Sequence, residues 1–377
     1  MTEPSTSRTI SNSPSSEPLL VVENLKTHFE IEAGMVKAVD GVSFTLERGK
    51  TLGIVGESGS GKTVLSRSVM RLNIAPNVHT AGSVRYDGVE LLDKTSREMQ
   101  DYWGAEMAMV FQDPMTSLNP VVKIGRQLTE HLRYHNKVSK KEARLQGIEL
   151  LRSVRIPEPE ERFSVYPHEM SGGMRQRVCI ASALACGPKM LFADEPTTAL
   201  DVTVQHQILN LLQTQQKDRF MTMILVTHDL GVVAGRTDDI AVMYAGKIVE
   251  KASTRSLFAD MRHPYTEALL RSIPKASNPS HTRLSAIAGR PPDLINPPAG
   301  CKFSPRCPYA QDRCREEEPQ IQADSAPGHE FACHFPVGTP ENKAAFEKNM
   351  ADGNPATLAA AGQITATEEL SSEGVTL

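Results

Sequence analysis

The chain has 377 residues, of which 40% are hydrophobic and 23% charged, and its formal net charge is −4. This length allows two or three domains, and the composition is ordinary for a globular protein. A weakly acidic chain without a block of Lys and Arg is not expected to have nucleic acid as its main partner. The apolar runs are too short to span a bilayer. We therefore expect an intracellular protein, in which clustered cysteines serve as ligands more often than as disulfides.

The first half of the chain begins with a segment rich in Ser, Thr and Pro and then shows strand patterns. Residues 1–17 lack the pattern of a secretory signal and are expected to form a disordered tail. Apolar residues then alternate with polar ones, or form short runs that end in glycine, as in strands. In chain order, strand patterns cover residues 19–30, 34–49, 51–56 and 82–92, a helix pattern covers 62–71, and mostly helical patterns cover 114–185.

The second half returns to strand patterns and then changes composition. Residues 189–194 and 221–229 are apolar runs that end in acidic residues or His, and residues 239–250 predict a hairpin with its turn at Ala245 and Gly246. After residue 257, Pro becomes frequent and cysteines cluster. We therefore divide the chain into one domain over 18–257, a C-terminal module over 258–338 and a tail over 339–377.

A glycine-rich segment lies between the third strand pattern and the first helix pattern. It is GESGSGKT and matches the phosphate-loop pattern G-x-x-x-x-G-K-[ST]. Glycines let many backbone N–H groups point at triphosphate oxygens, and the helix that follows adds its N-terminal dipole. We expect Lys62 to contact the β- and γ-phosphates and the Thr63 hydroxyl to ligate Mg²⁺; the alternative is a glycine-rich turn that matches by chance. The candidate ATP-binding residues are Gly56, Glu57, Ser58, Gly59, Ser60, Gly61, Lys62 and Thr63.

Two later strand patterns end in residues that suit a nucleotide site. Asp194 closes the run MLFAD, where it would hold Mg²⁺, and Glu195 follows, where a carboxylate can polarise the attacking water. His228 follows a further apolar run and could reach the γ-phosphate. Solvated acids and surface histidines are common at strand ends, so these assignments depend on the loop upstream.

Six motifs occur in a familiar order. GESGSGKT, FQDP, MSGGMRQR, ADEP, TALD and VTHD make residues 19–250 resemble the ATPase subunits of ABC transporters. The segments FQDPMTSLNP, RHPYTEALLRSIP and PPAGCKFSPRCPYA resemble those of bacterial dipeptide and oligopeptide importers in particular. The resemblance implies an α/β fold: a P-loop NTPase (RecA-like) core with an antiparallel β subdomain and a helical subdomain, plus a small C-terminal Cys-rich module.

The resemblance also implies roles for single residues. Phe29 resembles the aromatic residue that stacks on adenine, with a buried strand residue as the alternative. Gln112 resembles the glutamine that touches Mg²⁺ and senses the γ-phosphate. Glu195 resembles the catalytic base and His228 the switch histidine. Asp201 resembles the D-loop aspartate at a dimer interface. The signature that caps the γ-phosphate held by a partner subunit is matched by Ser171, Gly172 and Gly173.

The cysteine cluster is a second candidate site. Cys301, Cys307, Cys314 and Cys333 are spaced more widely than the tight pairs that zinc favours, and Cys307 is followed by proline, as often occurs beside cluster ligands. Four thiolates could hold a 4Fe–4S cluster, which some members of the peptide-importer family carry; zinc and free thiols remain alternatives. The position far from the nucleotide motifs favours a structural or regulatory role.

The resemblance finally implies a set of partners and cofactors. ATP and Mg²⁺ are the expected cofactors. The partners are a second ABC ATPase, giving a heterodimer, two transmembrane permeases and an extracytoplasmic solute-binding protein, with the chain peripheral on the cytoplasmic face of the bacterial membrane. The first alternative is import of nickel, haem or another small solute by the same machinery. The second is a soluble ABC ATPase that acts on nucleic acid or ribosomes.

Overall fold

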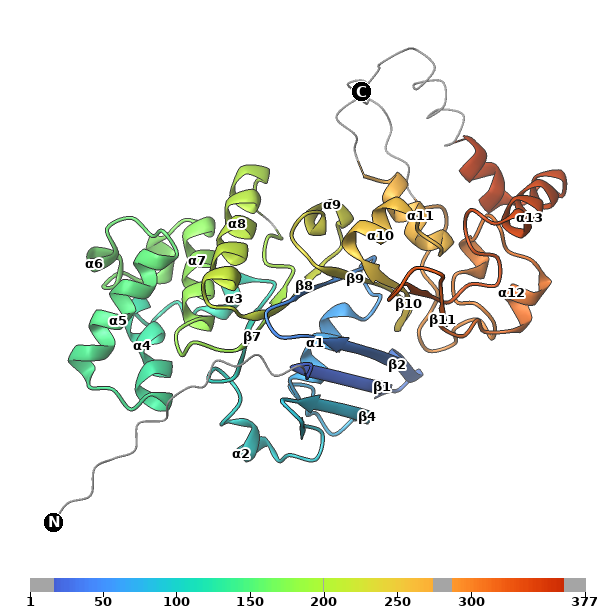
Figure 1. Cartoon of the computed structure of the whole chain (residues 1–377). Helices are drawn as coiled ribbons and strands as arrows, with labels where there is room; N and C mark the ends of the chain where they lie inside the picture. Colours follow the sequence, from blue (N-terminus) through green and yellow to red (C-terminus); the bar gives the residue numbers. More distant parts are fainter. Residues whose placement is uncertain (1–16, 199, 274–286, 363–377) are drawn as a thin grey trace, which may run out of the picture.

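The structure is a computed structural model that describes residues 17–198, 200–273 and 287–362. The expected N-terminal tail lies, except for residue 17, outside the described residues. The helical segment and the C-terminal module lie at opposite ends of the molecule, with the sheets between them (Figure 1). Within the described ranges, no helix is both long and apolar enough to cross a membrane.

The central sheet carries the nucleotide motifs. Its parallel strands lie in the order β9-β3-β8-β7-β6 and are almost entirely buried. Burial on both faces explains their continuous apolar sequences, which lack alternation. β10 pairs antiparallel with β9, so the hairpin expected around Ala245 and Gly246 is confirmed. These strands are β3 Thr51–Val55, β6 Met107–Val110, β7 Met190–Asp194, β8 Thr222–Thr227, β9 Asp239–Tyr244 and β10 Lys247–Ser253.

A second, antiparallel sheet packs beside the first in the order β2-β1-β4-β5. Helix α1, Lys62–Val69, contacts β1 and β2 of this sheet and β7 of the central one. One buried cluster, which includes Leu25, Leu65 and Phe192, joins the two sheets through this helix. The remaining elements of this region are β1 Leu20–Ile31, β2 Gly34–Leu46, β4 Val78–Tyr86, β5 Val89–Glu90 and α2 Ser96–Met99.

The segment expected to be helical is helical. Its longer helices α4, α5 and α7 pack on one another and bury apolar residues such as Leu128 and Leu151. Polar caps mark two helix starts, because the hydroxyls of Ser139 and Ser171 accept backbone N–H groups of the first turn. The elements are α3 Pro114–Ser117, α4 Ile124–His135, α5 Lys140–Ser153, α6 Pro159–Arg162, η1 Pro167–Glu169 and α7 Gly172–Ala183.

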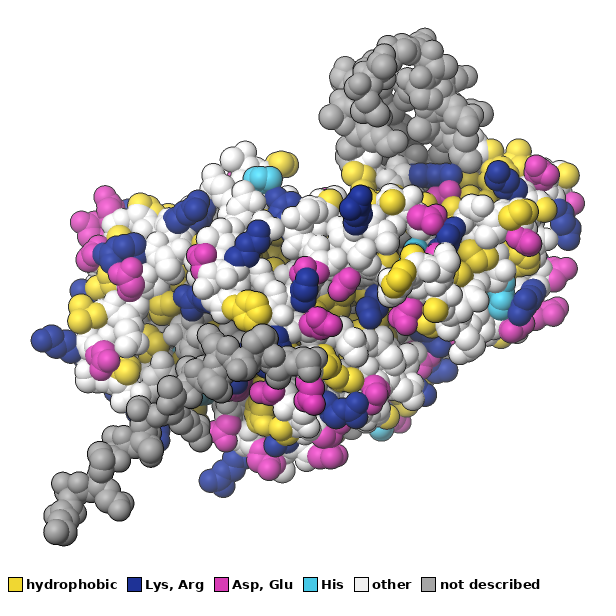
Figure 2. All heavy atoms as spheres, viewed as in Figure 1, with side chains coloured by type: hydrophobic (Ala, Val, Ile, Leu, Met, Phe, Trp, Pro, Cys, Tyr) yellow, Lys and Arg dark blue, Asp and Glu magenta, His cyan; other side chains and the backbone are white. Residues whose placement is uncertain are grey.

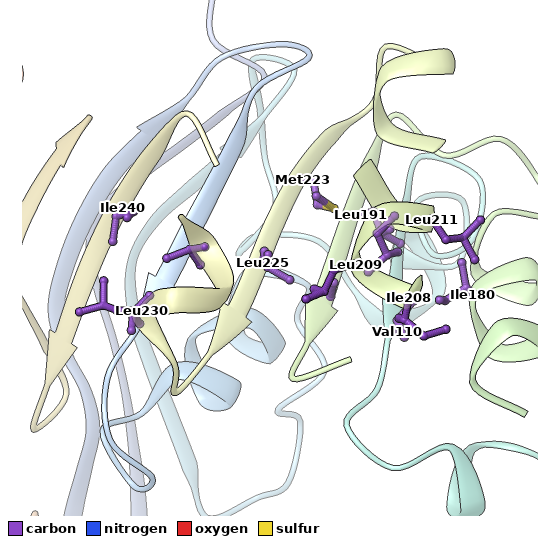
Figure 3. Packing of buried hydrophobic residues seen from close by; sticks show 14 of the residues in the cluster. Val110, Ile180, Leu191, Ile208, Leu209, Leu211, Met223, Leu225, Leu230 and Ile240 are labelled. Atoms are coloured by element: carbon purple, nitrogen blue, oxygen red, sulfur yellow. The ribbon is translucent and has the colours of Figure 1, made fainter. Parts of the chain in front are cut away.

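Two further helices cover the central sheet. α8, Val202–Asp218, lays Ile208, Leu209 and Leu211 close to Leu191 of β7, and α9, Leu230–Val233, follows β8 (Figure 3). Each of these side chains is at most 4% exposed. This packing fixes the carboxyl ends of β7 and β8, where the acidic and His candidates lie.

The C-terminal module is continuous with the central sheet. Strand β12, Glu330–Phe331, pairs with β10, and β11, Gln322–Ala323, pairs with β12. Phe303 and Tyr309 of the module belong to the same buried cluster as the helices described above. Helix α10, Thr254–Ala259, links β10 to the module, whose other elements are α11 Pro264–Arg271, η2 Ser304–Arg306 and α12 Asp312–Glu316.

The tail expected over 339–377 is corrected by the structure as far as residue 362. Helix α13, Pro340–Ala351, packs on the module, and residues 355–362 are also helical. Asn349 donates to the carbonyls of Pro308 and Ala310, both at 3.0 Å. The buried residues of α13 are Ala345 and two asparagines, and Phe346 is the large apolar side chain that packs, partly buried, against the core; these residues do not form a regular apolar period in the sequence.

Candidate functional site

The glycine-rich loop closes around its own lysine. Lys62 begins α1, is only 4% exposed, and donates to the carbonyls of Gly56 at 2.8 Å and Glu57 at 2.9 Å. Burial lowers the pKa of Lys62, and the neighbouring carboxylates partly oppose this effect. The ammonium is therefore held at the centre of the loop, where an anion would compensate its charge.

Two glycines of the loop are required by close backbone contacts. A Cβ at Gly56 would lie 2.1 Å from the Met243 carbonyl oxygen, and one at Gly61 would lie 2.1 Å from the Ala38 carbonyl oxygen. Gly61 also has φ of +101°, which side-chain-bearing residues rarely adopt. At Gly59, by contrast, a Cβ would meet open space. The loop is thus packed against the sheets on one side and open on the other.

The carboxyl end of β7 brings an acid to the start of α1. The Thr63 hydroxyl donates to Oδ1 of Asp194 at 3.0 Å, and Asp194 is 1% exposed. Its other oxygen, Oδ2, is buried without a hydrogen-bond partner in the described structure. Burial is also the largest influence on the Asp194 carboxyl and raises its pKa. An unpartnered buried carboxylate oxygen beside a hydroxyl suits a hard cation such as Mg²⁺.

Glu195 lies at the centre of a polar group drawn from three strand ends. Its carboxylate accepts from Gln112 Nε2 at 3.1 Å and from the Thr198 hydroxyl at 3.0 Å, and it lies 3.4 Å from Nδ1 of His228. Glu195 has φ of +44°, a strained conformation for a residue with a side chain. The tertiary structure thus holds this side chain in place at some conformational cost.

The contact between Glu195 and His228 shifts the pKa of both side chains. The hydrogen bond from His228 lowers the pKa of Glu195 most, and the bond to Glu195 raises the pKa of His228 most. Glu195 is therefore ionised at neutral pH, as a group that polarises water must be. His228 contacts Glu195 directly, whereas the sequence alone suggested only a contact with the γ-phosphate.

The remaining candidates lie apart from the loop. Ser171 and Gly172 are exposed at the start of α7, and Asp201 is exposed as the cap of α8. A Cβ at Gly173 would lie 2.9 Å from Val204, so the two helix starts are neighbours. Phe29 is half-buried in β1, opposite Val36 of β2 and Val78 of β4.

The four clustered cysteines line one small cavity, together with side chains that include His263, Phe303 and His334. Cys307, Cys314 and Cys333 are buried and Cys301 is half-buried. Burial raises the pKa of each thiol, that of Cys301 to about 11. Across residues 17–198, 200–273 and 287–362, however, no three His, Cys, Asp or Glu side chains are arranged to hold a metal ion, so the metal prediction is not confirmed.

Comparisons with known proteins identify the family. The family model described as "ABC transporter" matches residues 39–198, and that described as "Oligopeptide/dipeptide transporter, C-terminal region" matches residues 249–314. The "Oligopeptide transport ATP-binding protein OppD" of Bacillus subtilis is 51% identical over 304 residues, which cover 80% of this chain and 85% of that protein. The chain belongs to the ABC-transporter ATPase family. The "Dipeptide transport ATP-binding protein DppD" of Escherichia coli is 46% identical over 319 residues, which cover 85% of this chain and 97% of that protein.

Solved ABC cassettes share the fold. The dimeric cassette MJ0796, in a post-hydrolysis state bound to ADP and Pi, matches with a TM-score of 0.57 and 26% identity over 63% of this chain and 99% of that chain. The structure of cbiO1 from Clostridium perfringens matches with a TM-score of 0.54 over 65% of this chain. The expected cassette fold is confirmed. As an ABC ATPase, the protein couples ATP hydrolysis to a membrane transporter.

Two residues that contact the phosphate loop of this ABC ATPase were missed by sequence reasoning. Arg306 of the C-terminal module contacts the Glu57 carboxylate, and Tyr265 of α11 contacts the Glu57 backbone. Both come from segments that resemble the peptide-importer family, but neither sequence pattern indicates a contact with the loop. Only the tertiary structure, which brings the C-terminal segments next to the loop that follows β3, reveals these contacts.

Proposed function

We propose that this protein hydrolyses ATP to drive uptake of dipeptides or oligopeptides through membrane permeases. The peptide transport of the relatives named above supports a peptide cargo, and so does the match of residues 249–314 to the C-terminal region of oligopeptide and dipeptide transporters. The observation that carries the ATPase site is the Thr63–Asp194 hydrogen bond beside the group of Glu195, Gln112 and His228. A solute-binding protein outside the membrane would deliver the cargo.

In this proposal each side chain has a defined task. The backbone of residues 56–63 and the Lys62 side chain would bind the β- and γ-phosphates. Thr63, Asp194 and Gln112 would hold the magnesium ion. Mg²⁺ neutralises charge on the phosphate oxygens when it is bound. Glu195 accepts a hydrogen bond from the attacking water, and its low pKa keeps it ionised. His228 orients the Glu195 carboxylate through the contact to Nδ1.

A second ATPase subunit completes the site. The exposed helix start at Ser171 and Gly172 offers backbone N–H groups to an anion, and Asp201 lies on the neighbouring exposed cap. Gly173 completes this signature. A triphosphate held by one chain and capped by the signature of the other favours the closed pair because it bonds both faces. The dimeric state of the matched cassette MJ0796 supports this arrangement; we propose a different ATPase as partner, and Phe29 as the residue that stacks on adenine.

A groove beside the helical segment suits a permease. It has a volume of about 340 Å³ and is lined by residues that include Trp103, Phe111, Leu118 and His131. Phe111 is 40% exposed, although it is a large apolar side chain directly after β6. Since residue 112 is the glutamine that contacts Glu195, a permease segment seated here would be linked to the hydrolytic group. The protein would then work at the cytoplasmic face of the membrane.

We also propose that Cys301, Cys307, Cys314 and Cys333 hold a 4Fe–4S cluster. The shared cavity supports this proposal, as does the chemistry of the donor set, because four cysteine thiolates are the usual ligands of such a cluster. Protein purified without oxygen should contain iron and sulfide in equal amounts; zinc alone would overturn the proposal.

Cargo is tested by uptake in cells that lack the chromosomal copy of this gene. Wild-type protein should restore accumulation of labelled dipeptides and oligopeptides, and the Glu195→Gln variant should not. The Glu149→Gln variant is the matched control, because Glu149 lies exposed on α5 beside Arg152. Restored uptake of nickel or haem without restored peptide uptake would contradict the peptide assignment while leaving the ATPase assignment intact.

A further inference from the structure

The phosphate loop is held from outside by an arginine that follows it by 249 residues. Arg306 ends η2, between Cys301 and Cys307 of the cysteine cavity. Its Nη1 donates to Oε2 of Glu57 at 2.6 Å and its Nη2 donates to Oε1 at 2.9 Å. Two parallel N–H···O bonds of this kind fix the orientation of the guanidinium relative to the carboxylate as well as the distance between them.

The guanidinium itself has little freedom. Arg306 is only 5% exposed, and its Nε donates to the carbonyl of Ala288 at 2.9 Å. Its Nη1 also contacts the hydroxyl of Tyr244 at 3.3 Å. The module therefore holds the Arg306 guanidinium in one orientation beside the loop. The ion pair of Arg313 with Glu317 in the same module, by contrast, is exposed to solvent.

The backbone of Glu57 is held by a second group. Its N–H donates to the hydroxyl of Tyr265 at 2.8 Å. Tyr265 is fully buried, and its ring packs on Tyr244 at 4.5 Å and on Phe303 at 5.4 Å between ring centroids. Both the side chain and the amide of this loop residue are thus committed to the C-terminal part of the chain.

The contact matters for nucleotide binding for two reasons. The Glu57 carbonyl accepts from Lys62 Nζ at 2.9 Å, so a shift of Glu57 would displace the lysine that faces the phosphates. In addition, an unpaired Glu57 carboxylate would repel a triphosphate in the loop, and the Arg306 charge cancels this repulsion. Loss of the Arg306 contact would therefore weaken nucleotide binding through both effects.

We propose that Arg306 is a positioning residue for the phosphate loop, and that the folded C-terminal module thereby sets the affinity of the site for nucleotide. The proposal needs the ATP site of the family and neither the cargo nor a bound metal. By linkage, nucleotide binding must stabilise the module to the same extent. The cysteines of the cavity lie outside the ATP site. They would nevertheless affect nucleotide affinity, because η2, which carries Arg306, lies between Cys301 and Cys307.

The test is the affinity of full-length protein for the magnesium complex of a non-hydrolysable ATP analogue, measured by calorimetry. Contact residues of one network couple by amounts that correspond to a several-fold to hundredfold change, so Arg306→Gln should weaken binding by roughly tenfold. Its KM for ATP should rise in parallel, while kcat at saturation changes little. Arg306→Lys keeps the charge but not the paired hydrogen bonds. Its affinity for the analogue should lie between those of wild type and Arg306→Gln.

The double variant separates coupling from a direct effect of Glu57. With Glu57→Gln added, Arg306→Gln should bind no more weakly than Arg306→Gln alone, because the unpaired carboxylate has been removed. Arg313→Gln in the same module is the matched control and should bind like wild type. Wild-type affinity in Arg306→Gln would overturn the proposal, and so would losses that simply multiply in the double variant.

Hydrogen exchange keeps the proposal testable if Arg306→Gln does not fold. Backbone amides of residues 56–61 should exchange faster in Arg306→Lys and in Glu57→Gln than in wild type, without nucleotide. Adding the analogue to wild type should slow exchange in residues 301–307, as linkage requires. Unchanged exchange of the loop in both variants would overturn the proposal, whatever cargo or metal the protein carries.

Discussion

The phosphate loop and the cysteine cavity reach their geometry in different ways. In the loop, consecutive residues turn around Lys62, and the sequence alone dictates which backbone groups converge. In the cavity, Cys301 and Cys333 belong to segments separated by two short helices and two strands, and the pairing of β12 with β10 helps to bring these segments to one cavity. The comparison teaches that local sites are specified by motif, whereas distributed sites depend on the fold around them.

The two regions are nevertheless one structure. The module adds two strands to the edge of the central sheet, and the ion pair of Arg306 with Glu57 joins it to the loop. On the face seen in Figure 2, positive and negative side chains are interspersed over the molecule. Association with partners is therefore expected to depend on shaped sites, such as the groove beside Phe111, more than on overall charge.

The largest expected effect concerns ATP hydrolysis beside the phosphate loop, and it leaves the cysteine cavity unchanged. Glu195→Gln should reduce kcat for ATP hydrolysis by about 10²- to 10⁴-fold, because the neutral amide cannot act as the general base. Nucleotide affinity should stay near that of wild type, since Lys62 and the loop are unchanged. Steady-state ATPase assays and equilibrium binding measure the two quantities; near-normal turnover would refute the assignment of Glu195.

A pair of cavity-forming variants compares the stability of the two regions. Phe192 in β7 and Phe303 in the module are both at most 1% exposed. Each change to Ala should cost about 3–5 kcal/mol of packing free energy. Phe192→Ala should lower the free energy of global unfolding, measured with urea, whereas Phe303→Ala should loosen the module first.

Limited proteolysis distinguishes these outcomes. Phe303→Ala should be cleaved within residues 287–362 while the cassette remains intact and still binds nucleotide, although more weakly. Indistinguishable cleavage patterns for the two variants would show that the module and the cassette unfold as a single cooperative unit.

The cysteine variants test the distributed site. Cys333→Ser should lose most of the iron of the purified protein and the visible absorbance that accompanies it, because one of four ligands is removed. Cys186→Ser is the control, since Cys186 lies outside the module and does not line the cavity. Iron analysis and the spectrum of anaerobic protein are the measurements, and equal iron in both variants would contradict the ligand assignment.

The smallest expected effect concerns pH. The contact with Glu195 raises the pKa of His228, so it favours protonated His228 and stabilises the fold below the ordinary His pKa. That contribution disappears as the pH rises through the raised value. The carboxylate contribution of Glu195, whose pKa is lowered, disappears as the pH falls through its own folded value. An NMR titration should therefore show a His228 pKa above 6.5.

The matched measurement uses the Glu195→Gln variant. Loss of the carboxylate should move the His228 titration downward, toward the ordinary range. Because the His228 side chain is 60% exposed, solvent screens the pair and its effect on stability is expected to be small. A titration that does not move in the variant would mean that the two groups do not interact.

Sequence reasoning predicted the features that short-range patterns specify. The strand before the loop, the helix at Lys62 and the hairpin at Ala245 follow from apolar runs and turn residues. It failed at α13, whose fully buried residues are Ala345 and two asparagines. It also could not indicate that Glu57, one member of the loop, would direct both its amide and its carboxylate toward the C-terminal module.

The sequence by itself determined the family, the cassette fold and the chemistry of the loop, because motifs of consecutive residues fix backbone conformation and donor identity locally. Only the tertiary structure decided that Glu195 meets both Gln112 and His228, that four cysteines share one cavity, and that Arg306 reaches the loop. Each of these contacts joins residues distant in sequence. Strand pairing and core packing, rather than local preference, bring such residues together.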